Sequence, residues 1–416
     1  MQSQFKKDPD TIRYPITPEY VSTAPDKLVR LYEQLEENIL VYICEQFKQD
    51  SINATAIELI KQLQRRGFPL GEIESAIRRT TGLSEKEMAR LYEDAISRNE
   101  SFYGGVLEKL SLVGDTTRHA ALQAEISAIV NQAGDDVFNI TRSLGFAVRN
   151  ADGTVSFMPI ADAYQAALNK ASVSVWAGAN DYNSAIRVAI RELTDSGLQT
   201  IDYETGWHNR VDVAARRAVM TGIAQISAKY SDALMEEIDT PYLEVTAHRG
   251  ARDIDGPNGW ENHKRWQGKV YSKKDGDFYP SVYSACGLGD VAGLNGANCR
   301  HKYHAFVPGV MEPSYTQEEL DNIDPPPIEF EGREYTMYEA TQKQRQVETA
   351  LRNIKRRMIG YDSAGQTEQY QQTAAKYRRL HEEYMNFSKA ADLPVRYERL
   401  EVSGFGPKEH AKAIKS

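Results

Sequence analysis

The chain has 416 residues, which is long enough for two or three domains of ordinary size. Hydrophobic residues make up 41% of it and charged residues 26%, so it can form packed cores and has the composition of a globular protein. The 50 basic and 59 acidic side chains leave a net charge of −9, which excludes a uniformly basic nucleic-acid coat but allows a local basic face.

Three further features bear on the compartment. Residues 1–10 lack the apolar core of a signal peptide, and no uncharged stretch approaches the roughly 18 residues that a membrane span needs. The three cysteines, Cys44, Cys286 and Cys299, cannot form a disulfide framework. We therefore expect a protein of a reducing compartment, the cytoplasm of the cell that makes it, with no membrane partner.

The first region, residues 1–150, is predicted to be helical. From Pro25, which suits a first helical turn, apolar residues recur at helical spacing as far as Ile43. Ser84 and Glu87 form an S-x-x-E pattern, which predicts a helix that begins at Ser84 and runs towards Ser97. The predicted helices alternate with charged faces and carry no catalytic cluster, so this region is expected to be a bundle or a docking surface.

Residues 151–247 are predicted to form a helical central region. At its start, Asp152-Gly153 lies between two short apolar runs and predicts a β-hairpin. Helices are expected over residues 161–175 and 182–193, with Gly197 as a C-terminal stop, and over residues 211–237. The small residues of the last helix would allow close packing against a neighbour: Ala214, Ala215, Ala218 and Gly222.

The composition changes after His248. Residues 250–309 hold 10 of the 28 glycines, and helical periodicity disappears, so residues 248–311 are predicted to form a small Gly/Cys/His-rich α+β module. An acidic, proline-containing linker follows over residues 312–330. Residues 331–416 are predicted to be a basic helical hairpin, over 337–358 and 366–387, and a tail. The fold class expected for the whole chain is therefore mainly α.

The module carries the clearest cluster of chemically active side chains: Cys286, Cys299, His301 and His304, with His248 and His263 upstream. Thiolate and imidazole are the ligands of structural zinc, and a small module with little core is the kind of unit that a metal can hold together. The predicted ligands are His248, Cys286, Cys299 and His301. The spacing is not that of a standard zinc finger, because there is no C-x-x-C, so simple packing of these side chains stays open.

Two enzymatic alternatives use the same region. Cys299 could be a nucleophile with His301 or His304 as its base and Asp253 or Asp290 as the orienting group. A metal-dependent nuclease could use His248, Asn262, His263 and His304, although no ββα-metal pattern is recognised. The glycine-rich run at 287–296 lacks the GKS or GKT ending of a phosphate loop. No complete active site is recognised, so we expect no enzymatic activity, with these alternatives left open.

The C-terminal hairpin is the best candidate for contact with nucleic acid or a partner protein. Residues 341–390 contain ten Lys or Arg against five Asp or Glu. A solvated helix face is the alternative interpretation of the same charges. The residues expected to make such contacts are Arg352, Lys355, Arg356, Arg357, Lys376, Arg378 and Arg379.

Four ordered motifs carry a resemblance to a known family. They are His248-Arg-Gly-Ala-Arg, Trp266-Gln-Gly-Lys-Val-Tyr, Tyr279-Pro-Ser and Gly293-Leu-Asn-Gly-Ala-Asn-Cys-Arg-His. Together with segments 201–206 and 216–222, they resemble the phage minor capsid protein 2 family of tailed phages and prophages of Gram-positive bacteria. The resemblance covers most of the chain and is best over residues 182–309. Asn298-Cys299-Arg300 is also similar to a motif of the Mu F-like head morphogenesis proteins, although His301 stands where many of those have cysteine.

The resemblance implies a structural role. Proteins of this kind are minor virion components of the phage head, present in few copies at the portal vertex, where they assist head assembly and DNA packaging or ejection. The expected partners are the portal protein and the major capsid or other head proteins, with packaged double-stranded DNA as a further partner. The expected location is the virion, reached from the host cytoplasm during assembly. The resemblance carries over no enzymatic residue.

Overall fold

The computed structural model describes residues 14–48, 55–150, 152–201 and 206–415, so the prediction about residues 1–10 lies outside the described part of the chain. The chain forms two compact units, each assembled from three stretches of sequence. Unit 1 contains Met1–Asp26, Lys86–Asp135 and Arg217–Pro326, and unit 2 contains Lys27–Glu85, Asp136–Arg216 and Pro327–Ser416. None of the helices in the described residues combines the length and apolar character that a membrane span requires.

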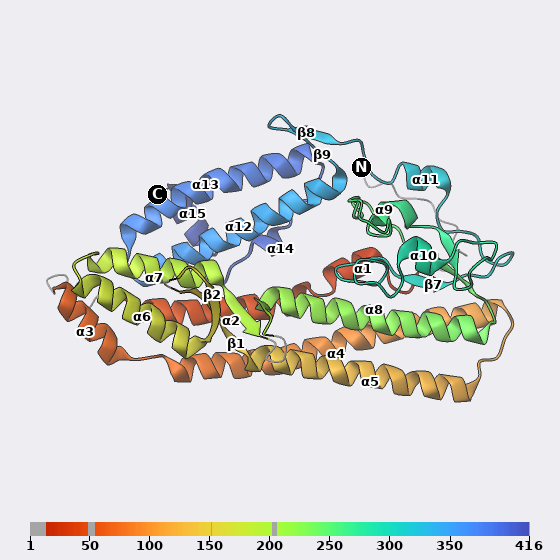
Figure 1. The fold of residues 1–416 in the computed structure, drawn as a ribbon, viewed down its shortest axis with the longest axis horizontal. Helices are drawn as coiled ribbons and strands as arrows, with labels where there is room; N and C mark the ends of the chain where they lie inside the picture. The colour runs from red at the N-terminus through yellow and green to blue at the C-terminus, as the bar shows by residue number, and fades with distance from the viewer. Residues whose placement is uncertain (1–13, 49–54, 151, 202–205, 416) are drawn as a thin grey trace. The chain divides into compact units, whose positions relative to one another are not determined.

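Unit 1 combines helices with the glycine-rich module. Its helices are α1 (Pro18–Thr23), the second half of α4 (Leu70–Lys109) and most of α5 (Thr116–Arg142) and α8 (Val211–Glu237). The module then contributes β5 (Tyr242–Val245), α9 (His263–Trp266), β6 (Val270–Ser272), α10 (Val282–Cys286) and β7 (Tyr303–Ala305), followed by α11 (Gln317–Asp321) (Figure 1).

A small antiparallel sheet with the strand order β6-β5-β7 forms the centre of the module. In the central strand, Leu243 lies opposite Tyr271 on one side and Ala305 on the other. Leu243 and Val245 are fully buried, so the short strands are held by packing as well as by hydrogen bonds. The segments between the strands are turns and two short helices, which confirms the expected small α+β module.

Unit 2 contains the predicted hairpins and the remaining helices. The N-terminal part supplies α2 (Asp26–Gln46) and α3 (Ala56–Arg66). A four-stranded antiparallel sheet has the strand order β2-β1-β3-β4. Its strands are β1 (Leu144–Arg149), β2 (Val155–Pro159), β3 (Leu198–Ile201) and β4 (His208–Arg210). In the sequence, α6 (Ile160–Trp176) and α7 (Tyr182–Ser196) connect β2 to β3. The C-terminal part supplies β8 (Ile328–Phe330), β9 (Arg333–Tyr335), α12 (Met337–Ser363), α13 (Thr367–Ala390), α14 (Tyr397–Leu400) and α15 (Pro407–Lys415). Helices α12 and α13 lie side by side as the expected hairpin (Figure 1).

Most of the expected elements are confirmed, including the mainly α class, the hairpin at Asp152-Gly153, and the helices from residues 161, 182, 211, 337 and 366. Gly197 ends α7 with a positive φ of 64°, a conformation that glycine adopts without a steric penalty. The predicted helix start at Ser84 is wrong. Helix α4 is continuous from Leu70, and Ser84 is buried within it, because a capping sequence has no effect where the preceding turn is already helical.

Two glycines allow close packing inside the units. In unit 1, a Cβ placed on Gly222 of α8 would lie 2.2 Å from the Tyr92 hydroxyl oxygen, which confirms the expected close contact along this helix. In unit 2, a Cβ on Gly360 of α12 would lie 2.9 Å from Ile190 and 3.2 Å from the Cys44 sulfur. Both helices therefore approach their neighbours more closely than any larger residue would permit.

Candidate functional site

Three of the module's histidine and cysteine side chains converge in unit 1. His263 lies in α9, while Cys299 and His301 lie in the segment that leads into β7. One ligand atom from each of these residues lies within 4.8 Å of the others, and all three side chains are buried. His301 Nδ1 lies 3.7 Å from Cys299 Sγ. The group is therefore a compact set of two imidazoles and one thiol without direct exposure to solvent.

Hydrogen bonds fix which nitrogen of each imidazole carries the proton. His263 Nε2 lies 2.9 Å from the Ala292 carbonyl oxygen, and His301 Nε2 lies 3.1 Å from Gln267 Oε1. The backbone N–H of His248 also donates to Gln267 Oε1, at 3.0 Å, which identifies that atom as the amide oxygen. Because both acceptors are carbonyl oxygens, each Nε2 donates, and each Nδ1 keeps its lone pair.

The surroundings of the cluster keep both imidazoles neutral. Burial lowers the pKa of His263 to about 4. Burial also lowers the pKa of His301 well below its usual range, and the neighbouring His248 and His263 add to that effect. Neutral imidazole is the form that binds metal ions, so the histidines need lose no proton before they bind one.

The other two predicted ligands lie near this group but outside it. The His248 ring stacks on the His301 ring, with centroids 4.5 Å apart and planes at 23°, and its Nδ1 lies 2.9 Å from the Arg249 carbonyl oxygen. Cys286 is buried in α10, where burial is the main cause that raises its thiol pKa. The structure thus brings together Cys299, His301 and His263, the last of which was in the sequence cluster but not among the predicted ligands.

The arrangements required for the two enzymatic alternatives are not assembled among the described residues. Among the described residues, His301 Nε2 donates to the Gln267 amide oxygen, whereas a thiol-hydrolase triad would need a carboxylate in that place. Asp290 instead accepts a hydrogen bond from the Ala292 backbone N–H at 2.8 Å. His304 Nε2 is paired with Glu244 at 3.3 Å, apart from the three-residue cluster, and Asn262 donates to Asp255 at 2.7 Å.

The seven basic residues predicted for external contact divide into three groups. The first group faces the interior of unit 2. Arg356 has no exposed side-chain surface, and its Nη2 lies 3.4 Å from Glu36 and 3.9 Å from Glu37. Arg352 pairs with Glu33 at 3.2 Å, and Lys355 donates to the Leu400 carbonyl oxygen at 2.5 Å. These three charges are used inside the unit, between α12, α2 and the C-terminal segment.

This buried network has displaced titrations. Burial raises the pKa of Glu37 to about 8, against the opposing effect of Arg356. Burial lowers the pKa of Lys355 to about 8. Glu36 is also fully buried and is shared between Arg356 and Arg210, whose Nη2 lies 3.2 Å from the same carboxylate oxygen. The network therefore holds several charges in a low-dielectric interior, where each depends on its partners.

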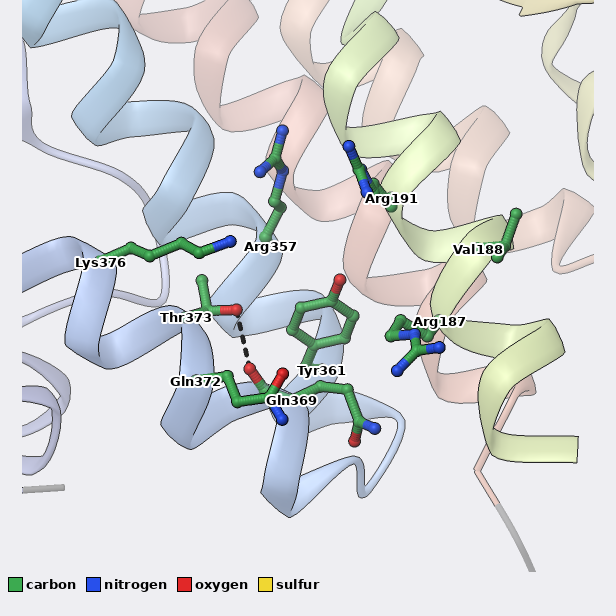
Figure 2. A pocket seen from close by; sticks show the side chains of 9 residues that line it. All are labelled: Arg187, Val188, Arg191, Arg357, Tyr361, Gln369, Gln372, Thr373 and Lys376. Carbon is green, nitrogen blue, oxygen red and sulfur yellow. Dashed lines mark hydrogen bonds between the residues drawn. The ribbon is translucent and has the colours of Figure 1, made fainter. Parts of the chain in front are cut away.

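The second group of basic residues borders an open pocket of about 360 Å³ in unit 2 (Figure 2). Arg357 and Lys376 line it from α12 and α13, and α7 adds Arg187 and Arg191. Figure 2 shows the four cationic side chains around the pocket, with Tyr361, Gln369, Gln372 and Thr373 completing the α12 and α13 side. Asp195 pairs with both Arg191 and Arg357, which leaves an excess of positive charge.

The last two predicted residues lie further along α13. Arg379 is exposed, and Arg378 donates to the Ala413 carbonyl oxygen at 2.7 Å. Arg187 and Arg191 were absent from the sequence prediction. Their spacing of four residues on one helix places them on the same face, but nothing in the sequence shows that α13 faces them.

The polar side chains described above contact other groups of their own unit, and these contacts alone do not define a class of protein. Comparison with known families shows which class this is. The family model of phage minor capsid protein 2 matches residues 16–387, so the chain belongs to the phage minor capsid protein 2 family. This confirms the resemblance and supports a structural role in a bacteriophage. No curated protein and no solved structure matches the chain significantly.

Proposed function

We propose that the chain is a minor structural component of a tailed-phage head, located near the portal vertex, that assists head assembly and DNA packaging or ejection. The observation that carries the proposal is the family match over residues 16–387, which spans parts of both units. The proposed protein partners are the portal protein and the major capsid or other head proteins.

The internal use of charge supports a structural role. A side chain that takes part in chemistry must reach its substrate, whereas Arg356, Glu36 and the His263–Cys299–His301 cluster are buried and face other parts of the same unit. Buried networks of this kind favour one arrangement of the helices over its alternatives. A component that takes a fixed place in a particle benefits from such rigidity.

The test of the main proposal is the protein's copy number in purified particles. Quantitative mass spectrometry of DNA-filled heads, made in cells that express the chain, should find it at a low and fixed ratio to the portal protein. Particles made without it should show a defect in head assembly or DNA content. Absence of the chain from particles, with normal heads formed without it, would refute the structural role and return attention to the enzymatic alternatives.

A second function, contact with packaged double-stranded DNA, is favoured by the basic pocket. Arg187, Arg191, Arg357 and Lys376 surround one open cavity, and the described residues place one carboxylate, Asp195, in ion pairs with two of them, Arg191 and Arg357. Phosphate oxygens suit both the guanidinium forks and the ammonium group. We therefore place the proposed DNA contact here and at the adjacent Arg379.

Salt dependence separates this contact from nonspecific attraction. The variant Arg187→Glu/Lys376→Glu should weaken duplex binding and reduce the slope of log K against log salt by about 2, one for each lost phosphate contact. Lys389→Glu is the matched control, because Lys389 is exposed on the same helix α13 but does not line the pocket. Equal loss in both variants, or duplex binding that does not depend on salt, would refute the contact at this pocket.

A further inference from the structure

We propose that His263, Cys299 and His301 bind one zinc-class divalent ion through Nδ1, Sγ and Nδ1. The proposal goes beyond the structural role in the head and does not depend on it. It rests on three features of the module: the distances between the ligand atoms, the tautomers that the hydrogen bonds fix, and the placement of the ligands on two segments that are far apart in the sequence.

The distances fit tetrahedral zinc. Bonds of about 2.3 Å to sulfur and about 2.0 Å to nitrogen, at a tetrahedral angle, place the two ligand atoms about 3.5 Å apart. The observed separation between Cys299 Sγ and His301 Nδ1 is 3.7 Å. One potential ligand atom from each of the three residues lies within 4.8 Å of the others, a separation that small side-chain rotations can shorten to fit one ion.

The hydrogen bonds around the cluster leave the Nδ1 lone pair of each imidazole available to a metal ion. The Ala292 carbonyl oxygen holds the Nε2 proton of His263, and Gln267 Oε1 holds that of His301. Metal-bound histidines almost always donate their second ring N–H to such an acceptor, which orients the ring and fixes the tautomer. Both rings therefore already have the proton arrangement that a metal ion requires.

The choice of ligands selects the class of ion. One thiolate and two imidazoles favour zinc and related borderline ions over magnesium or calcium, which prefer oxygen. The thiol must lose its proton on binding, so the apparent affinity rises with pH. The fourth position of the tetrahedron is left for a water molecule or a further side chain.

The bound ion would cross-link two distant segments of the module. His263 lies in α9, whereas Cys299 and His301 lie far along the sequence, after a long series of turns that contains α10. An ion shared by these segments closes that loop and adds its binding free energy to the stability of the fold. The contacts of Cys299 Sγ with His301 Nδ1, at 3.7 Å, and with the His301 carbonyl oxygen, at 3.8 Å, are long and weak, so the thiol has no strong competing partner among the described contacts.

The experiment uses the full-length chain, freed of metal with a chelator and then titrated with Zn²⁺ and Co²⁺. We expect one ion per chain by elemental analysis. The Co²⁺ form should show a thiolate-to-metal charge-transfer band together with the visible bands of tetrahedral cobalt. Zn²⁺ at about 1,000 times its Kd should raise the midpoint of thermal unfolding of unit 1 by about 8 °C or more.

Substitutions locate the ion. Cys299→Ser should abolish the charge-transfer band, and His263→Gln should lower the affinity by more than the 10–100-fold that is typical of a lost second-shell partner. Cys286→Ser is the matched control, because Cys286 is a buried cysteine of the same module outside the cluster, and this variant should keep the band and the stoichiometry.

Two results would overturn the proposal. The first is a full-length chain that folds, as judged by circular dichroism, but binds neither ion at stoichiometric amounts. The second is loss of the charge-transfer band in Cys286→Ser with retention in Cys299→Ser. Because the unsubstituted chain provides the first result, the test holds even where a variant fails to fold.

Discussion

Replacing Arg356 with methionine should destabilise unit 2 by about 3 kcal/mol. The guanidinium is fully buried, 3.4 Å from Glu36 and 3.9 Å from Glu37. At an effective dielectric constant of about 20, a pair 3.4 Å apart attracts with roughly 5 kcal/mol, and much of that offsets the desolvation of the charges. In the variant, Glu36 keeps Arg210, but Glu37 loses its nearest cation. Because the pKa of Glu37 is about 8, this carboxyl already carries a proton at pH 7, so the cost falls mainly on Glu36 and lies at the lower end of the range for a broken buried pair.

The neighbouring residue in the same helix is the matched control. Arg357 forms a partly exposed pair with Asp195, so Arg357→Met should cost no more than about 1 kcal/mol. Urea-induced unfolding, followed by far-ultraviolet circular dichroism at pH 7, gives both free energies of unfolding. If the two variants agree within about 0.5 kcal/mol, the buried ion-pair network does not stabilise the unit as described.

Three further outcomes are expected. Gly222→Ala should lower the free energy of unfolding by about 1–3 kcal/mol, because its Cβ would meet the Tyr92 hydroxyl. Gly104→Ala in α4 is the control, because open space surrounds Gly104, and it should raise the free energy of unfolding by about 1 kcal/mol. An equal effect of both variants in urea unfolding would contradict the packing argument. Burial raises the pKa of Glu37 to about 8 in the folded state, so the folded protein holds a proton that the unfolded chain loses, and the free energy of unfolding should fall as pH rises from about 4.5 to 8. Glu37→Gln should remove this part of the pH dependence of urea unfolding. An unchanged pH dependence in the variant would contradict the assignment to Glu37. Gln267→Ala should weaken Zn²⁺ binding about 10–100-fold in a competition titration while stoichiometry stays at one, and unchanged affinity would show that this amide does not orient the ligand.

The helices and the β1–β2 hairpin follow from local signals. Apolar spacing of 3.6 residues predicts α6, α7, α8, α12 and α13, and Asp152-Gly153 predicts the hairpin, because both depend on residues close in sequence. Ser84 shows the limit of such signals, since its capping pattern lies inside the longer helix α4. The composition of the two units could not be predicted, because each joins three stretches that are distant in the chain.

The candidate sites depend on the same long-range contacts. The sequence identified Cys299 and His301 as chemically notable, but only the fold shows that His263 lies beside them and that Cys286 lies outside the three-residue group. Likewise, Arg356 and Arg357 are adjacent in a basic stretch, yet one is buried and the other is partly exposed. Charge density alone does not distinguish them, because the orientation of α12 relative to α2 decides which arginine is buried against the α2 carboxylates.

The burial of all three native cysteines makes the chain suitable for selective labelling. Cys44 lies in a core where burial raises its thiol pKa to about 12, and Cys286 and Cys299 are also buried, so none of the three side chains is open to a reagent in solution. A single cysteine introduced at Val113, which is 95% exposed, would therefore react with a maleimide dye without removal of the native thiols. A fluorophore or gold cluster attached there would report the protein's position in an intact particle by microscopy.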